Sequence, residues 1–185
     1  MTKTGWPRVR PAILDDAPAI ADAHVRGWRT AYRGLVPDGV LDSMDVDTRS
    51  AWWRTRLRTS THPRDDEWVW VVETDVDTGG HAAVVGFAIT GPARDEAAPP
   101  PKGAGEVFAI YMTPEYVGQG LGRVLFAHAV EDLEDRGFRP VVVWVFEANP
   151  RARRFYEAAG FRADGARHAI DFGGEGIPEL RYRRA

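Results

Sequence analysis

Runs of apolar residues bounded by turn residues predict strands at several places along the chain. The runs are rich in β-branched and aromatic side chains, which favour strands over helices. Turn-forming residues between 75 and 81 separate the second run from the third, so we expect these two to form an antiparallel hairpin. The runs lie at residues 8–10, 67–73, 83–89, 107–112, 141–146, 162–172 and 179–183.

Apolar residues at helical spacing predict helices between these strands. Leu121 opens a stripe with a four-residue repeat that predicts a helix over residues 120–136. The first helix is expected to begin after Asp15, a suitable N-cap, and to end at Gly34. Further helices are expected at residues 36–43, at 47–60 and from Asn149 to about 161.

Residues 91–103 interrupt this pattern. They are rich in Pro, Ala and charged residues and show no periodicity. We expect a mobile loop of unusual length, a feature that often accompanies function or disorder.

The composition predicts one domain over residues 1–185. Hydrophobic residues make up 44% and charged residues 28%, and the length suffices for a sizeable core. The net charge of −3 gives no positive field for nucleic acid, so we expect Trp52 and Trp53, which lie among arginines, to sit on a solvated helix. No apolar run is long enough to cross a membrane and the first residues lack a signal-peptide stretch, so we expect a cytoplasmic protein without a membrane partner. Cysteine is absent, which excludes a thiolate metal site and a thiol nucleophile.

A glycine turn (residues 118–122) lies between the strand at 107–112 and the helix that follows. Pro114 ends the strand, and glycines occupy positions 118, 120 and 122. A turn at a helix N-terminus leaves backbone N–H groups unpaired, and glycines allow an anionic group to approach them closely. The spacing fits neither GxxxxGK(S/T) nor GxGxxG, so a nucleotide-hydrolysing loop and a dinucleotide site are disfavoured. The ligand predicted is a phosphate or pyrophosphate.

Two segments resemble the signature motifs of one enzyme family. Residues 117–122, Val-Gly-Gln-Gly-Leu-Gly, resemble the pyrophosphate loop of the GNAT superfamily of acyl-CoA-dependent N-acetyltransferases, written Arg/Gln-x-x-Gly-x-Gly/Ala. Residues 149–161 resemble its second signature, in which an asparagine opens a helix that ends in Phe-Tyr-x-x-x-Gly-Phe. The resemblance is specific over about residues 106–161. Val117 stands where the family usually has Arg or Gln, which removes one side-chain contact but leaves the backbone amides in place.

The resemblance implies a GNAT-like fold of the α/β (α+β) class. Its sheet would be mixed and mostly antiparallel, with about six to seven strands flanked by helices. The strands at 107–112 and 141–146 would form its central parallel pair, splayed apart around the thioester. The helix at 120–136 would connect them by a right-handed crossover.

The resemblance also implies acetyl-CoA as co-substrate and no metal. The glycine turn would hold the pyrophosphate, and Asn149 the pantetheine arm. The charge and position of Arg123, rather than the resemblance, predict a contact with a phosphate of coenzyme A. A backbone group near Met112, where the strands should separate, would stabilise the oxyanion. The cofactor-binding residues expected are Ile110, Tyr111, Met112, Val117, Gly118, Gln119, Gly120, Leu121, Gly122, Arg123 and Asn149.

Acetyl transfer from a thioester to an amine needs a proton acceptor for the amine and benefits from a donor for the thiolate. Glu106 is the candidate base, because it begins the strand before the glycine turn, on the face expected to carry Phe108, Ile110 and Met112. Its position also resembles that of the base in the histone-acetylating branch. Tyr156 occupies the position of the family's thiolate-protonating tyrosine. The alternatives are a solvated glutamate and a tyrosine that only packs. Weaker candidates for the base are His168 and Glu147.

Residues 28–34 resemble a stretch of many bacterial members in which the first helices form a wall of the acceptor cleft. Trp28 and Tyr32 are therefore candidate substrate-binding residues, although aromatic pairs four residues apart often serve only packing. The favoured function is an N-acetyltransferase that acts on a primary amine of a small molecule or peptide in a ternary complex. The alternative is a non-catalytic acyl-CoA-binding or regulatory module. The sequence does not identify the acceptor, and it leaves a homodimer open.

Overall fold

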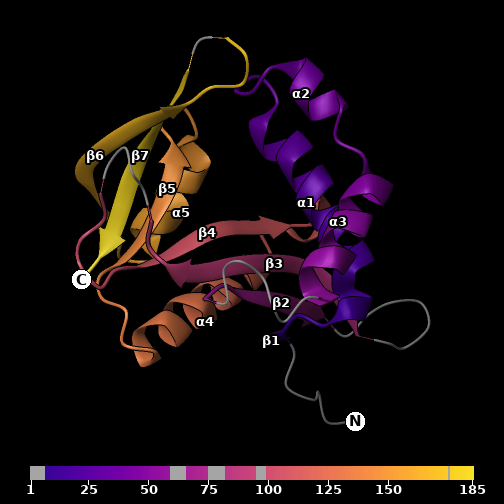
Figure 1. Cartoon of the computed structure of the whole chain (residues 1–185), viewed down its shortest axis with the longest axis horizontal. Helices are drawn as coiled ribbons and strands as arrows, with labels where there is room; N and C mark the ends of the chain where they lie inside the picture. The colour runs from indigo at the N-terminus through magenta and orange to yellow at the C-terminus, as the bar shows by residue number, and fades with distance from the viewer. Residues whose placement is uncertain (1–6, 59–65, 75–81, 95–98, 175) are drawn as a thin grey trace.

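The computed structural model describes residues 7–58, 66–74, 82–94, 99–174 and 176–185, whose strands form one sheet (Figure 1). The strands are β1 (Arg8–Pro11), β2 (Trp68–Thr74), β3 (Ala83–Pro92), β4 (Gly105–Met112), β5 (Val141–Phe146), β6 (Arg162–Ile170) and β7 (Ile177–Arg184). Their order is β1-β2-β3-β4-β5-β7-β6. All neighbours are antiparallel except β4 and β5, which confirms the expected mixed sheet.

Helices cover both faces of this sheet. They are α1 (Ala17–Tyr32), α2 (Asp38–Asp42), α3 (Val46–Arg58), α4 (Leu121–Asp135) and α5 (Pro150–Ala158). On one face α1 and α3 pack over β2 to β4, where Trp53 meets Phe87 with ring centroids 5.1 Å apart. Trp53 is fully buried, so the expectation of a solvated position was wrong for this residue, whereas Trp52 is exposed. On the other face α4 and α5 pack around Phe126, whose ring lies 5.3 Å from that of Tyr156. Within the described ranges, no helix is long and apolar enough to cross a membrane.

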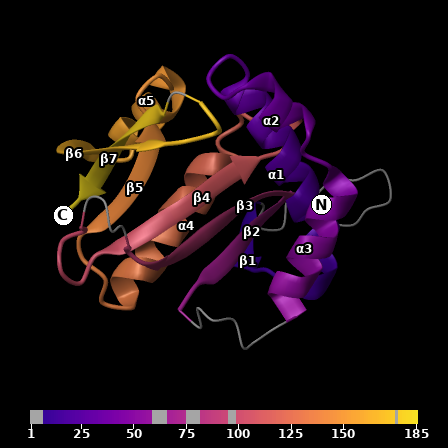
Figure 2. The same ribbon diagram turned by 45° about the horizontal axis from the view of Figure 1, so that its top comes forward.

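β4 and β5 are paired over only two residues. Gly105 lies opposite Val141 and Glu106 opposite Val142, and the register ends there. Beyond this point β4 runs on toward α1, whereas β5 turns away together with β7 (Figure 2). The expected splayed parallel pair is confirmed. The strands separate directly after Glu106 rather than near Met112, so the expected position of the separation was wrong.

A bulge in β4 lies next to this separation. Ile89 of β3 is opposite Ala109, but the next residue, Thr90, is opposite Val107. Phe108 is therefore an extra residue without a partner on β3. Such a bulge bends the strand and increases its local twist, which helps to turn β4 away from β5.

The bulge also changes which face of β4 each side chain occupies. Val107 and Ile110 both pack in the core under α4, although an unbroken strand would place them on opposite faces. Tyr111 packs toward α1. Glu106 precedes Val107 and therefore lies on the Tyr111 side. The prediction that Glu106 shares a face with Ile110 and Met112 was wrong, because two-residue alternation breaks at a bulge.

The predicted loop at residues 91–103 begins later than expected. Gly91 and Pro92 extend β3 and pair with β4. A Cβ atom at Gly91 would lie 2.9 Å from the ring of Phe108, so this glycine marks a close approach of two strands rather than a turn. The expected start of the loop was therefore wrong, and residues 95–98 lie outside the described residues.

Apolar side chains join the two separated halves of the sheet across the gap. Phe146, at the end of β5, is buried against Val36 and Leu41 from the segment after α1. Phe172, after β6, packs on both Phe146 and Trp28 of α1, with ring centroids 6.4 Å apart in each pair. Packing therefore holds β4 and β5 apart where strand hydrogen bonds no longer join them.

Candidate active site

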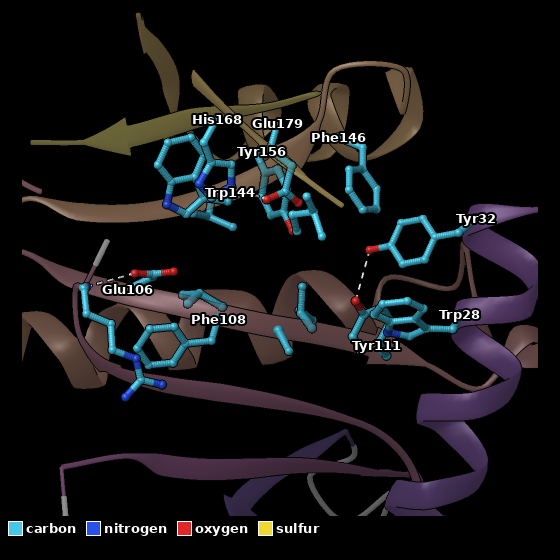
Figure 3. Close-up of a pocket in the computed structure, with 16 residues that line it drawn as sticks. Trp28, Tyr32, Glu106, Phe108, Tyr111, Trp144, Phe146, Tyr156, His168 and Glu179 are labelled. Carbon is cyan, nitrogen blue, oxygen red and sulfur yellow. Dashed lines mark hydrogen bonds and ion pairs between the residues drawn. The ribbon is translucent and has the colours of Figure 1, made fainter. Parts of the chain in front are cut away.

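A cavity of about 360 Å³, here called the central cavity, lies between β4 and β5 where they have separated (Figure 3). One wall comes from β4 and α1, and the other from β5, β6, β7 and α5. Residues predicted from the sequence for three different roles meet in this space. They are Trp28, Tyr32, Glu106, Ile110, Tyr111 and Tyr156.

Glu106 is a buried carboxylate where β4 and β5 are still paired. Only 6% of the residue is exposed, and its Oε2 accepts a hydrogen bond from the backbone N–H of Arg94 at 3.3 Å. The guanidinium of Arg94 turns away and lies over the ring of Phe108, 4.2 Å from its centroid. Glu106 therefore lines the central cavity, and the alternative of a solvated glutamate at the strand start was wrong.

Tyr156 enters the central cavity from α5, on the wall opposite Glu106 (Figure 3). Burial raises the pKa of its phenol, and the nearby Tyr32 and Glu179 raise this pKa further. The phenol is therefore protonated across the whole physiological pH range. In this state it is a hydrogen-bond donor.

His168 and Glu179 form a pair on the same wall as Tyr156. Nε2 of His168 lies 2.7 Å from Oε2 of Glu179, and the imidazole stacks on Trp144 with ring centroids 4.1 Å apart. Sequence reasoning considered His168 but missed Glu179 and Trp144. Trp144 lies in the apolar run of β5 and Glu179 near the start of β7, and only the order of β5, β7 and β6 brings them beside the histidine.

The α1 side of the central cavity is aromatic. The hydroxyl groups of Tyr32 and Tyr111 are 3.0 Å apart, and burial raises the pKa of both phenols. Trp28 packs edge-on against Tyr32 with centroids 5.0 Å apart. Trp28 and Tyr32 thus combine the packing role with a place on the cavity wall.

The glycine turn lies outside the central cavity, after the short 3-10 turn Pro114–Tyr116 that follows β4. Gly118 and Gly120 both have φ of +88°, and Gly120 is the N-cap of α4. Among the described residues, no group accepts a hydrogen bond from the backbone N–H groups of residues 118–122. Five consecutive donors at the N-terminus of a 15-residue helix form a site suited to an anion.

The remaining predicted binding residues have structural contacts. Ile110, Met112 and Leu121 are partly buried and pack against the core on the α4 side of the sheet, and Ile110 also lines the central cavity. Oδ1 of Asn149 caps α5 by accepting the N–H of Ala152 at 3.0 Å, which leaves its amide nitrogen to donate. The side-chain amide of Gln119 donates a hydrogen bond to the carbonyl of Glu115 at 2.8 Å and so braces the glycine turn. Val117 is half-buried, and Arg123 is exposed.

Known proteins share this arrangement over most of the chain. The sequence model that describes the acetyltransferase (GNAT) family matches residues 29–161 of the chain. The chain belongs to the GNAT acetyltransferase family. As a GNAT protein it is an acyltransferase. No cluster of metal-binding side chains occurs within the part of the chain that the structure describes.

Three individual proteins illustrate this GNAT membership. The chain is 36% identical over 151 residues to "Uncharacterized N-acetyltransferase YuaI" of Bacillus subtilis, covering 81% of this chain and 77% of that protein. It is 39% identical over 75 residues to "[Ribosomal protein bS18]-alanine N-acetyltransferase" of Escherichia coli, covering 40% and 45%. The structure of the PaiA N-acetyltransferase from Thermoplasma acidophilum in complex with coenzyme A gives a TM-score of 0.71 at 15% identity, covering 97% and 99%, and shows a common fold.

His24, which sequence reasoning did not single out, lies behind the aromatic wall of this GNAT site. It stacks on Tyr111 with centroids 5.5 Å apart, and its Nδ1 accepts the indole N–H of Trp53 at 3.4 Å. Burial, and secondarily the charge of Arg49, lowers the pKa of His24 to about 4. The imidazole is therefore neutral at neutral pH.

This lowered pKa predicts a pH-dependent loss of stability. As pH falls below about 6.5, the unfolded chain binds a proton at His24 before the folded chain does, so the stabilisation present above pH 6.5 is lost toward pH 4. The loss reaches up to about 3 kcal/mol. Urea unfolding of the wild type and of His24→Gln should therefore give free energies of unfolding that converge as pH falls from 7 to 4. Parallel pH profiles for the two proteins would contradict a neutral buried His24.

Proposed function

We propose that the chain transfers an acetyl group from acetyl-CoA to a primary amine by direct attack in a ternary complex. The observation that carries the proposal is the gap between β4 and β5. It leads from the glycine turn at one end to a cavity with Glu106 and Tyr156 on opposite walls. A thioester lying in this gap would have a proton acceptor on one side and a hydrogen-bond donor on the other.

The glycine turn is the proposed pyrophosphate site. Its five unpaired N–H groups and the positive end of α4 suit a dianionic group. Nothing lies within 4 Å of where a Cβ would stand at Gly118 or Gly120, so a ligand can reach the backbone. Arg123 would add a positive charge, and the free amide nitrogen of Asn149 would meet the pantetheine arm.

In the proposed reaction the amine nitrogen forms a bond to the thioester carbonyl carbon, and the carbon–sulfur bond then breaks. Glu106 accepts the proton that the acceptor ammonium must lose before its nitrogen can attack. Unpaired backbone N–H groups of β4 beyond Glu106 are the proposed donors to the oxyanion. The coenzyme A thiolate leaves toward Tyr156.

Tyr156 would act mainly as a hydrogen-bond donor to that thiolate. A thiol has a pKa of about 8.5, below that of an ordinary phenol, and burial raises the pKa of Tyr156 further. Complete transfer of the phenol proton to sulfur is therefore uphill. The hydroxyl lowers the energy of the developing negative charge, and the thiolate takes its proton from solvent after release.

The acidic lining of the central cavity supports an amine acceptor. Glu106 and Glu179 face it from opposite walls, and a protonated amine would be attracted there before it loses its proton (Figure 3). The relative that acts on a ribosomal-protein alanine agrees with a peptidyl or small-molecule amine. The alternative expectation, a non-catalytic acyl-CoA-binding module, would need neither carboxylate, and membership of an acyltransferase family argues against it.

Substitution of Gly120 tests the pyrophosphate site. Gly120→Ala places a Cβ in the cradle at a φ of +88°, and should weaken coenzyme A binding by about tenfold or more in calorimetry. Gly173→Ala is the matched control, because Gly173 also has a φ of +88° and open surroundings but lies in the turn after β6. Both variants should lose about 1 kcal/mol of stability from backbone strain. Equal coenzyme A affinity in both would refute the assignment.

The roles of Glu106 and Tyr156 are separable by kinetics. Glu106→Gln should lower kcat/KM by about 10²–10⁴ near neutral pH, with partial recovery at high pH, where more of the acceptor is already neutral. Tyr156→Phe should lower kcat by about tenfold to a hundredfold with little change in the KM for acetyl-CoA, because its contact strengthens only as the thiolate forms.

Glu147→Gln is the control for these kinetics. Glu147 was the weaker candidate for the base, and it pairs with Arg167 at the surface. Its replacement should leave the pH–rate profile unchanged. If Glu106→Gln keeps the acidic limb of the pH–rate profile, another group is the base, and the His168–Glu179 pair is the next candidate.

A further inference from the structure

A second cavity, of about 490 Å³, adjoins the central cavity. Trp28 lines both cavities. The second cavity, here called the outer cavity, lies between α1, the segment from α2 into α3, and Phe172, where the chain leaving β6 approaches α2 (Figure 1). Aromatic side chains, Trp28, Trp52 and Phe172, form much of its lining. Trp28 is therefore the side chain that an acceptor with its amine in the central cavity would have to pass to reach the outer cavity.

Arg49 brings to the outer cavity a positive charge that no carboxylate of the described residues neutralises. No carboxylate among the described residues pairs with its guanidinium, which lies 5.5 Å from the ring centroid of Trp52. Trp52 is itself 44% exposed, an unusual position for a tryptophan that serves only the core. The ring limits the movement of the guanidinium, so a ligand would meet an oriented donor.

The other polar groups of the outer cavity are already engaged. Asp45 accepts the backbone N–H of Thr48 at 2.7 Å and thereby caps the start of α3. The hydroxyl of Ser43 donates to the carbonyl of Val40 at 2.8 Å. His24 is neutral at neutral pH. Arg49 is therefore the lining group with both a full charge and unused hydrogen-bonding capacity.

We propose that the outer cavity binds the part of the acceptor remote from its amine, and that Arg49 binds a carboxylate there. The acceptor class would be an amine with an apolar or aromatic middle section and a carboxylate at the other end, such as an amino acid or a short peptide. A guanidinium binds a carboxylate through two parallel N–H···O bonds, which adds orientation as well as affinity. This inference rests on the proposed function, because it assigns the acceptor of the same transfer reaction.

A competing assignment would give the remote end of the ligand a positive charge instead of a negative one. Asp45 also lines the outer cavity and is a carboxylate, so it would favour a second ammonium group on the ligand. Its pKa is lowered, with the Thr48 backbone N–H as the main cause, so it is charged at neutral pH. Asp45→Asn removes the charge and keeps a side chain able to cap α3. If the ligand carries a carboxylate, this variant should bind it about two- to fivefold more tightly, because repulsion is removed.

The test compares acceptors that differ only in the terminal group. The probes are Ala-Phe against Ala-Phe amide, and ω-amino acids of about four to eight carbons against their amides. Binding is measured by calorimetry with coenzyme A present, and transfer by thiol release. The wild type should prefer carboxylates over amides by about tenfold to a hundredfold, and Arg49→Gln should abolish that preference while the KM for acetyl-CoA stays unchanged. Arg49→Lys should restore part of it.

Arg54→Gln is the matched control. Arg54 is an exposed residue of the same helix and does not line the outer cavity, so the net charge changes equally while the preference for carboxylates should persist. Equal use of carboxylate and amide probes by the wild type, or loss of the preference in Arg54→Gln as well, would overturn the inference and leave acetyl transfer intact. Tighter binding of diamines that is lost in Asp45→Asn would also overturn it. Carboxylate binding that depends on Arg49 but leads to no thiol release would uphold the subsite and refute the proposed function instead.

Discussion

The early end of the β4–β5 pairing is the constraint on which the rest of the structure depends. Two adjacent parallel strands normally continue their hydrogen bonds along their shared length, because unpaired backbone groups in a protein interior are costly. Here the pairing ends after Glu106 and Val142, and the extra residue Phe108 bends β4 at that point. The space that opens contains a cavity rather than a packed core, and its free backbone groups are available to a ligand.

Packing outside the gap compensates for the missing strand contacts. Phe146 and Phe172 connect the β5–β7 half of the sheet to α1 and the segment after it. This cluster sets the distance between the walls that carry Glu106 and Tyr156. It also places Trp28 at the boundary of two cavities, so the residues that hold the sheet open belong to the surface that a substrate would meet. Stability and recognition therefore depend on the same aromatic side chains.

Local chemistry explains which features were predictable from the sequence. The glycine turn, with the helix that follows it, could be predicted from the sequence. Positive φ values, as at Gly118 and Gly120, are adopted readily by glycine alone, so the residue type itself indicates them. The parallel pair could be predicted because a helix connects two apolar runs and because the motifs resemble those of one family. The candidate roles of Glu106 and Tyr156 came from the resemblance, which left open whether Glu106 is solvated and whether Tyr156 only packs.

The features that the sequence did not predict depend on contacts between distant segments. Gly91 is a residue type typical of loops, but here it lies in a strand where the ring of Phe108 on the neighbouring strand leaves no room for a side chain. The bulge at Phe108 has no local signature, so the face of Glu106 was assigned by an alternation that the real strand interrupts. Glu179 joins His168 only through the order of the last three strands. In each case a tertiary contact overrides the local sequence pattern.

A crystal structure with acetyl-CoA bound would show directly whether the ligand occupies the gap between β4 and β5. We expect the pyrophosphate to lie on the backbone N–H groups of residues 118–122 and the pantetheine to pass between β4 and β5. The sulfur should then lie in the central cavity within about 3.5 Å of the Tyr156 hydroxyl, a contact distance for a hydrogen bond to sulfur. A complex in which β4 and β5 close together, with the thioester outside the gap, would contradict the account.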